Sequence, residues 1–489
     1  MTYAPSGRMR LLTSVCSALA LSGCMMGPDF QAPHPAVPAS YTHDAPAGAR
    51  PYVSGDAVDP QWWNSFNDPI LTQLEAQGVT QNLDLKIATE RLLQAEAEAQ
   101  IQGAVLYPNL NGSASYTREK PSDEGPLGLF SKDFPPVTNA YDLYQYGLQT
   151  QYDLDLWGKN RRLVEAAIAQ ARSSEEARRA ALLNVEAQVA SNYIQLRESE
   201  AVLAITQQNL DTANKLVNLT VERQQAGLTT QLDVADAKAT AASISAQIPT
   251  LTAQRDALIG QIGLLLGQTP DGLPTELVTT QPVPLTPPVV PVGMPSDLLQ
   301  RRPDVREATE DLHAATAEIG VAKAQFFPDV TLSASASLQS LQFKSLNEWK
   351  ALTYGIGPNV TIPIFEGGQL KGQLSLRKAQ QREAAVGYAK TVLTAFTQVN
   401  TALTNYEQEH ATLDALNEDV KQAQIALNLA ENQYTQGLTD YLFVLNAQQA
   451  LLSAQVNQAQ STARLGTDLV TLYQALGGGW EQTYPQTAT

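Results

Sequence analysis

Three short stretches of the chain alternate strictly between apolar and polar side chains. From Tyr144 to Leu156, Tyr and Leu occupy all the even positions but one, while Gln, Gly and Asp occupy the odd positions. The same phase recurs from Val330 to Gln339 and from Tyr354 to Ile364, and a weaker fourth stretch runs from Leu110 to Tyr116. A period of two residues is typical of β-strands, whose side chains point alternately to the two faces of a sheet. We therefore predict four strands, at about 108–120, 141–157, 328–343 and 353–365.

Long tracts without helix breakers separate and follow these stretches. No Gly or Pro occurs from Lys159 to Ala226, and no Pro occurs from Ile364 to Tyr484. A helix over the first tract would be about 100 Å long, or about three times the hydrocarbon thickness of a bilayer. We expect such a helix to project into an aqueous space.

The two halves of the chain repeat each other. The segment Thr89–Ser115 matches Thr309–Ser335, and Gly227–Val234 matches Gly437–Val444, each at a constant offset. Each half is predicted to run helix, strand, loop, strand, very long helix, turn and long helix. The expected organisation is a signal peptide at 1–23, a lipid-anchored extended segment at 24–66, a first repeat at 67–267 with its long hairpin at 158–267, a Pro-rich linker at 268–302, a second repeat at 303–475 with its long hairpin at 366–475, and a C-terminal tail at 476–489.

The strands favour a membrane barrel over the half-buried sheet of a water-soluble domain. A single strand would fit either interpretation, but four strands occur in a chain with very long helices and no later apolar run of about 18 residues. Four strands cannot close a barrel, because about eight are needed. Two copies would give eight strands and a filled interior, whereas three would give twelve and a water-filled lumen. The alternation leaves that choice open.

The N-terminus carries an export signal. Arg8 and Arg10 precede an apolar run that ends in Leu21-Ser22-Gly23-Cys24, and these features are typical of a signal peptide. The last four residues resemble the lipobox of bacterial lipoproteins, which implies a covalent lipid on Cys24. An ordinary secretory signal is the alternative. Met25 resembles the residue that follows the cysteine in lipoproteins sorted to the outer membrane.

The charge and the titratable residues argue against nucleic-acid binding and catalysis. The net charge of −17 lacks the basic footprint that phosphates require. The four histidines are scattered, and we expect His313 and His410 to be exposed on helices. Arg301-Arg302-Pro303-Asp304 could bind an anion, but a helix start at Pro303 is favoured. We predict no enzyme, no metal site and no cofactor besides the lipid.

Four longer motifs resemble those of outer membrane efflux proteins, and in particular the OprM-like or NodT-type lipoproteins of resistance-nodulation-division systems. They are Trp62-Trp63-Asn64-Ser65-Phe66-Asn67-Asp68-Pro69, the run from Met294 to Arg306, Ile319-Gly320-Val321-Ala322 before Phe326-Phe327-Pro328, and Pro363-Ile364-Phe365-Glu366-Gly367-Gly368. The resemblance implies a mixed α/β membrane protein. In it, a homotrimer forms a twelve-stranded β-barrel in the outer membrane, continuous with a long periplasmic α-helical barrel. It also implies two partners, a periplasmic adaptor and an inner-membrane resistance-nodulation-division transporter.

The same resemblance assigns roles to the turns between the long helices. The tip that contacts the adaptor would comprise Gly227, Leu228, Thr229, Gly437, Leu438 and Thr439. A periplasmic gate would comprise Asp233, Asp236, Tyr434, Leu442 and Asn446, with Tyr434 as a gate-locking tyrosine. Asn446 departs from the Asp that relatives often carry. The local alternative makes Asp233 part of a capping box with Thr230, and Asp440 an N-cap.

The predicted function is therefore a passive exit channel of a tripartite efflux pump, which exports small toxic molecules from the periplasm. A lipid-anchored periplasmic coiled-coil adaptor or tether is the alternative, since it also has long helical hairpins. It would lack alternating strands beside both hairpins. A lipid-anchored enzyme would need a titratable cluster that the sequence does not present.

Overall fold

The computed structural model describes most of the chain, namely residues 25–38, 41, 52–122, 124, 140–269, 272–273, 277 and 279–484. These residues form two compact units, each considered by itself. The first is built from residues up to Pro33, from Leu93–Arg172 and from Thr309–Val386, and the second from the remaining segments. The expected signal peptide and Cys24 lie outside the described residues. Among the helices that are described, none is long and apolar enough to cross a membrane.

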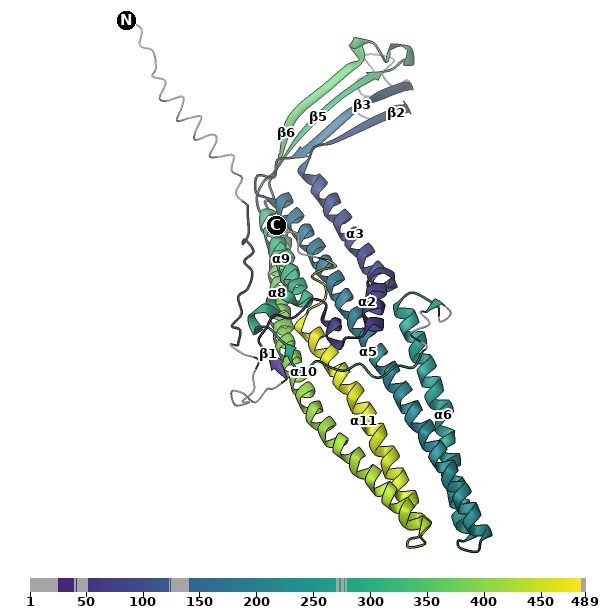
Figure 1. Ribbon diagram of the computed structural model, residues 1–489. Helices are drawn as coiled ribbons and strands as arrows, with labels where there is room; N and C mark the ends of the chain where they lie inside the picture. Colours follow the sequence, from purple (N-terminus) through teal and green to yellow (C-terminus); the bar gives the residue numbers. More distant parts are fainter. Residues whose placement is uncertain are drawn as a thin grey trace. The chain divides into compact units, whose positions relative to one another are not determined.

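The first unit contains a four-stranded antiparallel sheet in the order β2-β3-β5-β6 (Figure 1). Its strands are β2 (Asn109–Glu119), β3 (Tyr141–Asp153), β5 (Asp329–Ser340) and β6 (Leu352–Thr361). The central pair, β3 and β5, comes from different halves of the chain. The sheet therefore joins the two repeats and has β2 and β6 as its edges.

The second predicted strand, which was expected to continue to 157, ends at Asp153. Asp155 has a left-handed backbone with φ of 45°, which breaks the extended conformation. Its carboxylate accepts the backbone N–H of Asn160 at 2.9 Å. The alternation thus continues past the strand because side-chain type does not report this turn into the next helix.

The last strand and the helix after it also shift from their expected boundary near 365. β6 ends at Thr361 and α10 begins at Gln369. Pro363 has no N–H for the ladder, and Gly368 has a φ of 94° that other residues rarely adopt. A short turn therefore separates the strand from the helix.

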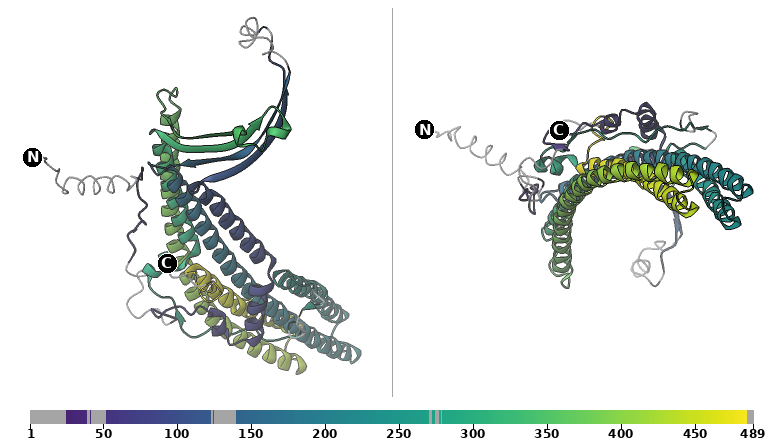
Figure 2. Two further views of the ribbon diagram at one scale, coloured as in Figure 1. Left: turned by 90° about the horizontal axis from the view of Figure 1, so that it is seen from above. Right: turned by 60° about the horizontal axis from the view of Figure 1, so that its bottom comes forward.

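In each half of the chain, two shorter helices precede two long ones. They are α2 (Pro69–Gln81), α3 (Leu83–Gly103), α5 (Lys159–Gln225) and α6 (Gln231–Leu265), then α8 (Leu298–Arg301), α9 (Pro303–Ala324), α10 (Gln369–Thr435) and α11 (Tyr441–Leu476). In the second unit, α5 runs beside α6 and α10 beside α11 (Figures 1 and 2). The short elements are β1 (Val53–Ser54) paired in parallel with β4 (Val290–Pro291), and the 3₁₀ turns η1 (Trp62–Phe66), η2 (Ala104–Leu106), η4 (Pro295–Asp297), η5 (Phe343–Ser345) and η6 (Trp349–Ala351).

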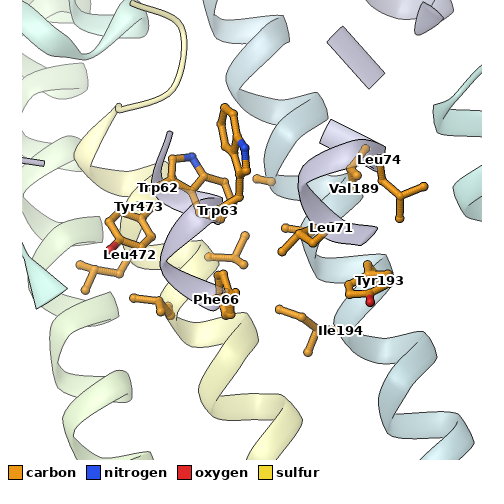
Figure 3. Packing of buried hydrophobic residues seen from close by; sticks show 14 of the residues in the cluster. Trp62, Trp63, Phe66, Leu71, Leu74, Val189, Tyr193, Ile194, Leu472 and Tyr473 are labelled. Carbon is orange, nitrogen blue, oxygen red and sulfur yellow. The ribbon is translucent and has the colours of Figure 1, made fainter. Parts of the chain in front are cut away.

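The central core of the second unit explains the Trp-Trp motif. Trp62 is buried, stacks on Tyr473 of α11 with centroids 5.3 Å apart, and meets Trp63 edge-on (Figure 3). Asp68 caps α2, accepting the N–H of Ile70 at 2.8 Å, and also accepts the hydroxyl of Tyr193 on α5 at 2.7 Å. The motif thus packs the N-terminal segment onto both long hairpins.

Two histidines expected to be exposed are half-buried, so that prediction is wrong. His313 stacks on Phe30 with centroids 4.3 Å apart, and His410 stacks on Tyr52 at 3.9 Å. In each case a segment near the N-terminus covers a helix from the second repeat. Helix periodicity cannot indicate such coverage, because the covering residues lie hundreds of positions away.

The Arg-Arg-Pro-Asp motif starts a helix, as expected. Pro303 is the first residue of α9 and Asp304 lies in its first turn. Arg302 is buried, pairs with Asp304 at 2.6 Å and donates to the carbonyl of Ala475 at 2.8 Å. Its donors are therefore used within the protein.

Candidate channel wall and hairpin tips

The register of the four strands gathers most of the apolar side chains on one side of the sheet. Residues directly opposite each other in a sheet share a face, and Leu148 lies opposite Gly112 and Ala336. Ala336 in turn lies opposite Tyr354. The same side, here called the apolar face, also carries Leu110, Tyr116, Tyr144, Tyr146, Tyr152, Leu332, Leu338, Ile356 and Val360.

The apolar face is exposed within the protein chain. Tyr354 is 80% exposed, Ile356 75% and Leu148 55%. Exposing such side chains to water costs about 25 cal/mol for each Å² of apolar surface. Contact with lipid removes that cost, and the face is therefore suited to a membrane.

The opposite side, here called the polar face, carries small or neutral polar side chains over the middle of the sheet. One row of opposed residues consists of Asn111, Gln149, Ser335 and Gly355. These residues help to line a hollow of about 440 Å³. Neutral hydrogen-bonding groups keep such a wall hydrated without holding fixed charge.

The polar face carries charge at its two ends, with Glu119 of β2 at the end remote from the long helices and a paired cluster at the helical end. Lys159, the first residue of α5, lies 3.3 Å from the carboxylate of Asp153 and 3.2 Å from that of Asp329. This cluster of paired charges lies where the polar face meets the start of α5.

The first hairpin tip, between α5 and α6, is fixed by two capping arrangements. Gly227 has a φ of 73°, and Leu228 N–H donates to the Arg223 carbonyl at 2.8 Å, as in a Schellman C-cap. Thr230 and Asp233 then form a reciprocal capping box at the start of α6. Hydrogen bonds from Thr229 and Thr230 hold the pKa of Asp233 below its usual value. The capping alternative for Asp233 is therefore present in the structure.

The second tip, between α10 and α11, repeats only the first of these arrangements. Gly437 has a φ of 75° and Leu438 N–H donates to the Gln433 carbonyl at 2.9 Å. Asp440 occupies the N-cap position of α11, but its side chain forms no capping hydrogen bond. Phe443 stands where the first repeat has Asp233, so the reciprocal carboxylate is missing.

A cation and two tyrosines connect the tips. The guanidinium of Arg223 lies over the ring of Tyr434, 4.6 Å from its centroid, and donates to the Thr435 carbonyl at 3.1 Å. Tyr434 is buried and meets Tyr441 edge-on at 5.8 Å. Burial, with Tyr434, Asp236 and Asp233 nearby, raises the pKa of Tyr441 to about 12.

The structure sorts the expected gate residues into two groups. Tyr434 is buried between the hairpins, whereas Asp236, Leu442 and Asn446 are exposed and Asp233 is half-buried. The expected tip residues Leu228 and Leu438 are also exposed, at 67% and 70%. Arg223 was missed because only its place in the last turn of α5 marks it in the sequence, and its partners lie more than two hundred residues away.

Comparison with known proteins decides the family. A sequence profile described as "Outer membrane efflux protein" matches residues 77–268 and 294–478, one match in each repeat. The chain belongs to the outer membrane efflux protein family.

This outer membrane efflux protein is similar to characterised relatives over nearly its full length. It is 35% identical to the antibiotic efflux pump outer membrane protein ArpC of Pseudomonas putida, over 97% of this chain and 96% of ArpC. It is 31% identical to nodulation protein T of Rhizobium leguminosarum bv. trifolii, over 97% and 98% of the two chains. Its fold matches the outer-membrane channel OprN with a TM-score of 0.86 and 30% identity, covering 94% of this chain and 100% of that one.

The expected resemblance is thereby confirmed, together with the mixed α/β fold, the outer-membrane location and the role as an efflux channel. The fold assignment rests on the similar solved structures and on the sheet and hairpins described above. The roles of individual tip residues stay predictions.

Proposed function

We propose that this outer membrane efflux protein is a passive, trimeric exit duct whose barrel wall is the four-stranded sheet. The observation that carries the proposal is the separation of an exposed apolar face from a neutral polar face across all four strands. Such a wall suits lipid outside and water inside. The protein would carry out no reaction and would need no cofactor.

Closure of the barrel requires further copies of the chain. The edges β2 and β6 would leave unpaired backbone groups in lipid, and each costs several kcal/mol. Pairing β6 of one copy with β2 of the next removes both edges. Three copies supply twelve strands, enough for a water-filled lumen, whereas two copies would give a filled interior.

Cross-linking and conductance test the duct together. We expect a cross-linking ladder of the purified protein to end at three copies, and the protein to form pores in planar bilayers. A ladder ending at one or two copies, or a trimer that conducts no ions, would contradict the proposal.

The duct would work with a periplasmic adaptor and an inner-membrane resistance-nodulation-division transporter. The exposed Leu228 and Leu438 at the two tips are suitable apolar contacts for an adaptor. Replacing both by Asp should reduce adaptor cross-linking while leaving the trimer intact. Unchanged cross-linking would place the adaptor elsewhere.

Three copies of Asp233 and Asp236 would form an acidic ring that closes the tip. Carboxylates about 6 Å apart repel by about 3 kcal/mol at an effective dielectric near 20, so a multivalent cation would bind there and block the pore. We expect Asp233→Asn with Asp236→Asn to weaken trivalent-cation block from the periplasmic side, and Asn446→Asp to strengthen it. Equal block in all three proteins would shift the gate to the exposed Leu442.

The lipid on Cys24 would assist the barrel in anchoring the duct. A buried acyl chain contributes about 0.8 kcal/mol per CH₂, but the barrel alone should suffice. Cys24→Ser behind a non-lipoprotein signal should still give an outer-membrane trimer. A water-soluble periplasmic monomer would contradict the barrel.

A further inference from the structure

The connection between β5 and β6, residues 341–351, is a folded loop. It contains the 3₁₀ turns η5 and η6. Leu346 N–H donates to the Phe343 carbonyl at 3.2 Å, and Ala351 N–H donates to the Glu348 carbonyl at 2.9 Å. Leu346, which follows η5 directly, is buried. The loop therefore presents its remaining side chains from a defined backbone.

The loop packs against the apolar face of the sheet. The hydroxyl of Tyr146 donates to the side-chain carbonyl of Asn347 at 2.6 Å, and Phe343 meets Tyr144 edge-on with centroids 5.6 Å apart. Both tyrosines belong to the apolar face by register. The loop thus lies on the side of the sheet that would meet lipid, not on the side of the lumen.

The loop combines exposed aromatic rings with exposed cations. Trp349 is 84% exposed and Phe343 72%. Lys344 and Lys350 directly follow these two residues, are exposed, and form no ion pair within the described part of the chain. Aromatic rings prefer the membrane interface, and lysines there attract anionic headgroups.

Among the described residues, the acids of the loop and of the facing end of β3 leave the positive charge of the loop in excess. Glu348 is the one acid of the loop and is exposed. Asp142, on the neighbouring β3, is already paired with Arg118 at 3.1 Å and accepts the Tyr116 hydroxyl at 2.9 Å. The two lysines therefore remain available to an external anion.

We propose that residues 341–351 bind the phosphate groups of a lipopolysaccharide in the outer leaflet. Lys344 and Lys350 contact the phosphates, while Phe343 and Trp349 contact the acyl chains. The chain passes from β6 directly toward α10, so this loop lies at the end of the sheet remote from the start of that helix. The inference rests on the proposed function, because that function places the apolar face in the membrane and the helices in the periplasm.

Thermal unfolding of the purified full-length protein in detergent tests this site. The probes are lipopolysaccharide, the same lipid after dephosphorylation, phosphatidylglycerol and inorganic phosphate. The test variant is Lys344→Gln with Lys350→Gln. The control is Lys378→Gln with Lys421→Gln, which removes the same charge from exposed positions on α10.

We expect lipopolysaccharide to raise the melting temperature of the wild type and of the control by several degrees. The shift should fall by at least half in the loop variant, and dephosphorylated lipid should not distinguish the three proteins. Equal shifts in the loop variant and the wild type would overturn the inference. A full shift with phosphatidylglycerol or inorganic phosphate would overturn the assignment to lipopolysaccharide.

Conductance separates this inference from the proposed function. The loop variant should form pores of wild-type conductance in planar bilayers, because its substitutions lie on the side away from the lumen. If pores form normally but lipopolysaccharide gives no differential shift, only the binding site is wrong. If the wild type forms no pore, the proposed function fails independently.

Discussion

The sheet of the first unit and the central core of the second use large apolar side chains in opposite ways. In the core, Trp62 is 1% exposed and packs against rings from α11 and η1. In the sheet, Tyr354 is 80% exposed, and Ile356 on the same face is 75% exposed. In the core, large apolar side chains are covered by other parts of the chain, whereas in the sheet they are left for lipid to cover. Exposure of apolar residues in the sheet is therefore a feature of its surroundings and not a packing defect.

The largest difference should appear when tryptophans are truncated in the two regions. Trp62→Ala should cost about 3–5 kcal/mol, because it leaves a cavity in the core. Trp349→Ala, in the exposed loop, should change the free energy of unfolding in detergent by less than about 0.5 kcal/mol. Denaturant unfolding followed by helical circular dichroism measures both. Similar losses would show that the two surroundings do not differ.

The next prediction separates the two faces of β3. Arg at Leu148 should cost about 2–4 kcal/mol if the site lies near the bilayer midplane. Arg at the adjacent Gln149 should be tolerated, because the side chain would enter a hydrated lumen. The yield of trimer that changes mobility on heating compares the variants. Equal damage at both positions would exclude a wet interior.

The core also buries two acids, in contrast to the uncharged middle of the polar face. Glu75 and Glu186 are buried, and burial is the main cause that raises the pKa of each carboxyl well above its usual value; the nearby Glu186 also raises that of Glu75, and Glu481 that of Glu186. The folded protein therefore keeps protons that the unfolded chain releases near pH 4.5. This contribution to stability is complete below that pH and is lost as the pH rises toward the raised pKa values.

A pH series of unfolding measurements tests this pair. Each acid should add a slope of up to about 1.4 kcal/mol per pH unit within its window. Glu75→Gln or Glu186→Gln should flatten the loss of stability toward alkaline pH. Glu418→Gln, at an exposed site on α10, is the control and should leave the alkaline loss unchanged, because hydrogen bonds lower the pKa of the Glu418 carboxyl and its contribution changes only at acid pH. A wild-type profile without this loss would show that the acids find partners in solution.

The smallest expected effect distinguishes the two hairpin tips. Asp233→Ala removes the carboxylate of the capping box and should cost about 1 kcal/mol, with faster hydrogen exchange in the first turn of α6. Asp440→Ala should have almost no effect, because the Asp440 side chain makes no capping bond. Matching exchange at both tips would remove the asymmetry between the repeats.

The two faces of the sheet could be predicted from the sequence, because a strand with lipid on one face and water on the other alternates between apolar and polar residues. Tyr144, Tyr146 and Leu148 lie on one face as their even positions indicate. The predicted ends of the strands were less accurate, because a single turn residue such as Asp155 ends a strand without interrupting the alternation. Local backbone conformation decides those boundaries.

Contacts between distant segments could not be predicted from spacing alone. Gly320 belongs to a motif found by resemblance, but only the three-dimensional structure shows why a glycine is needed at this position. A Cβ there would lie 2.7 Å from both Arg162 Cγ and the Met26 carbonyl, so the N-terminal segment passes too close for any side chain. The contact of Arg223 with Tyr434 likewise depends on how two hairpins pack.

Cysteine labelling along β3 and β6 tests the central claim most directly. Single cysteines at Leu148, Gln149, Ile356 and Gly357 are treated with a membrane-impermeant thiol reagent in planar bilayers while conductance is recorded. We expect Gln149→Cys and Gly357→Cys to react and reduce the conductance, whereas Leu148→Cys and Ile356→Cys should not react. Equal reaction at all four positions, or reaction without any change in conductance, would contradict a wall with lipid on its apolar face and the export path on its polar face.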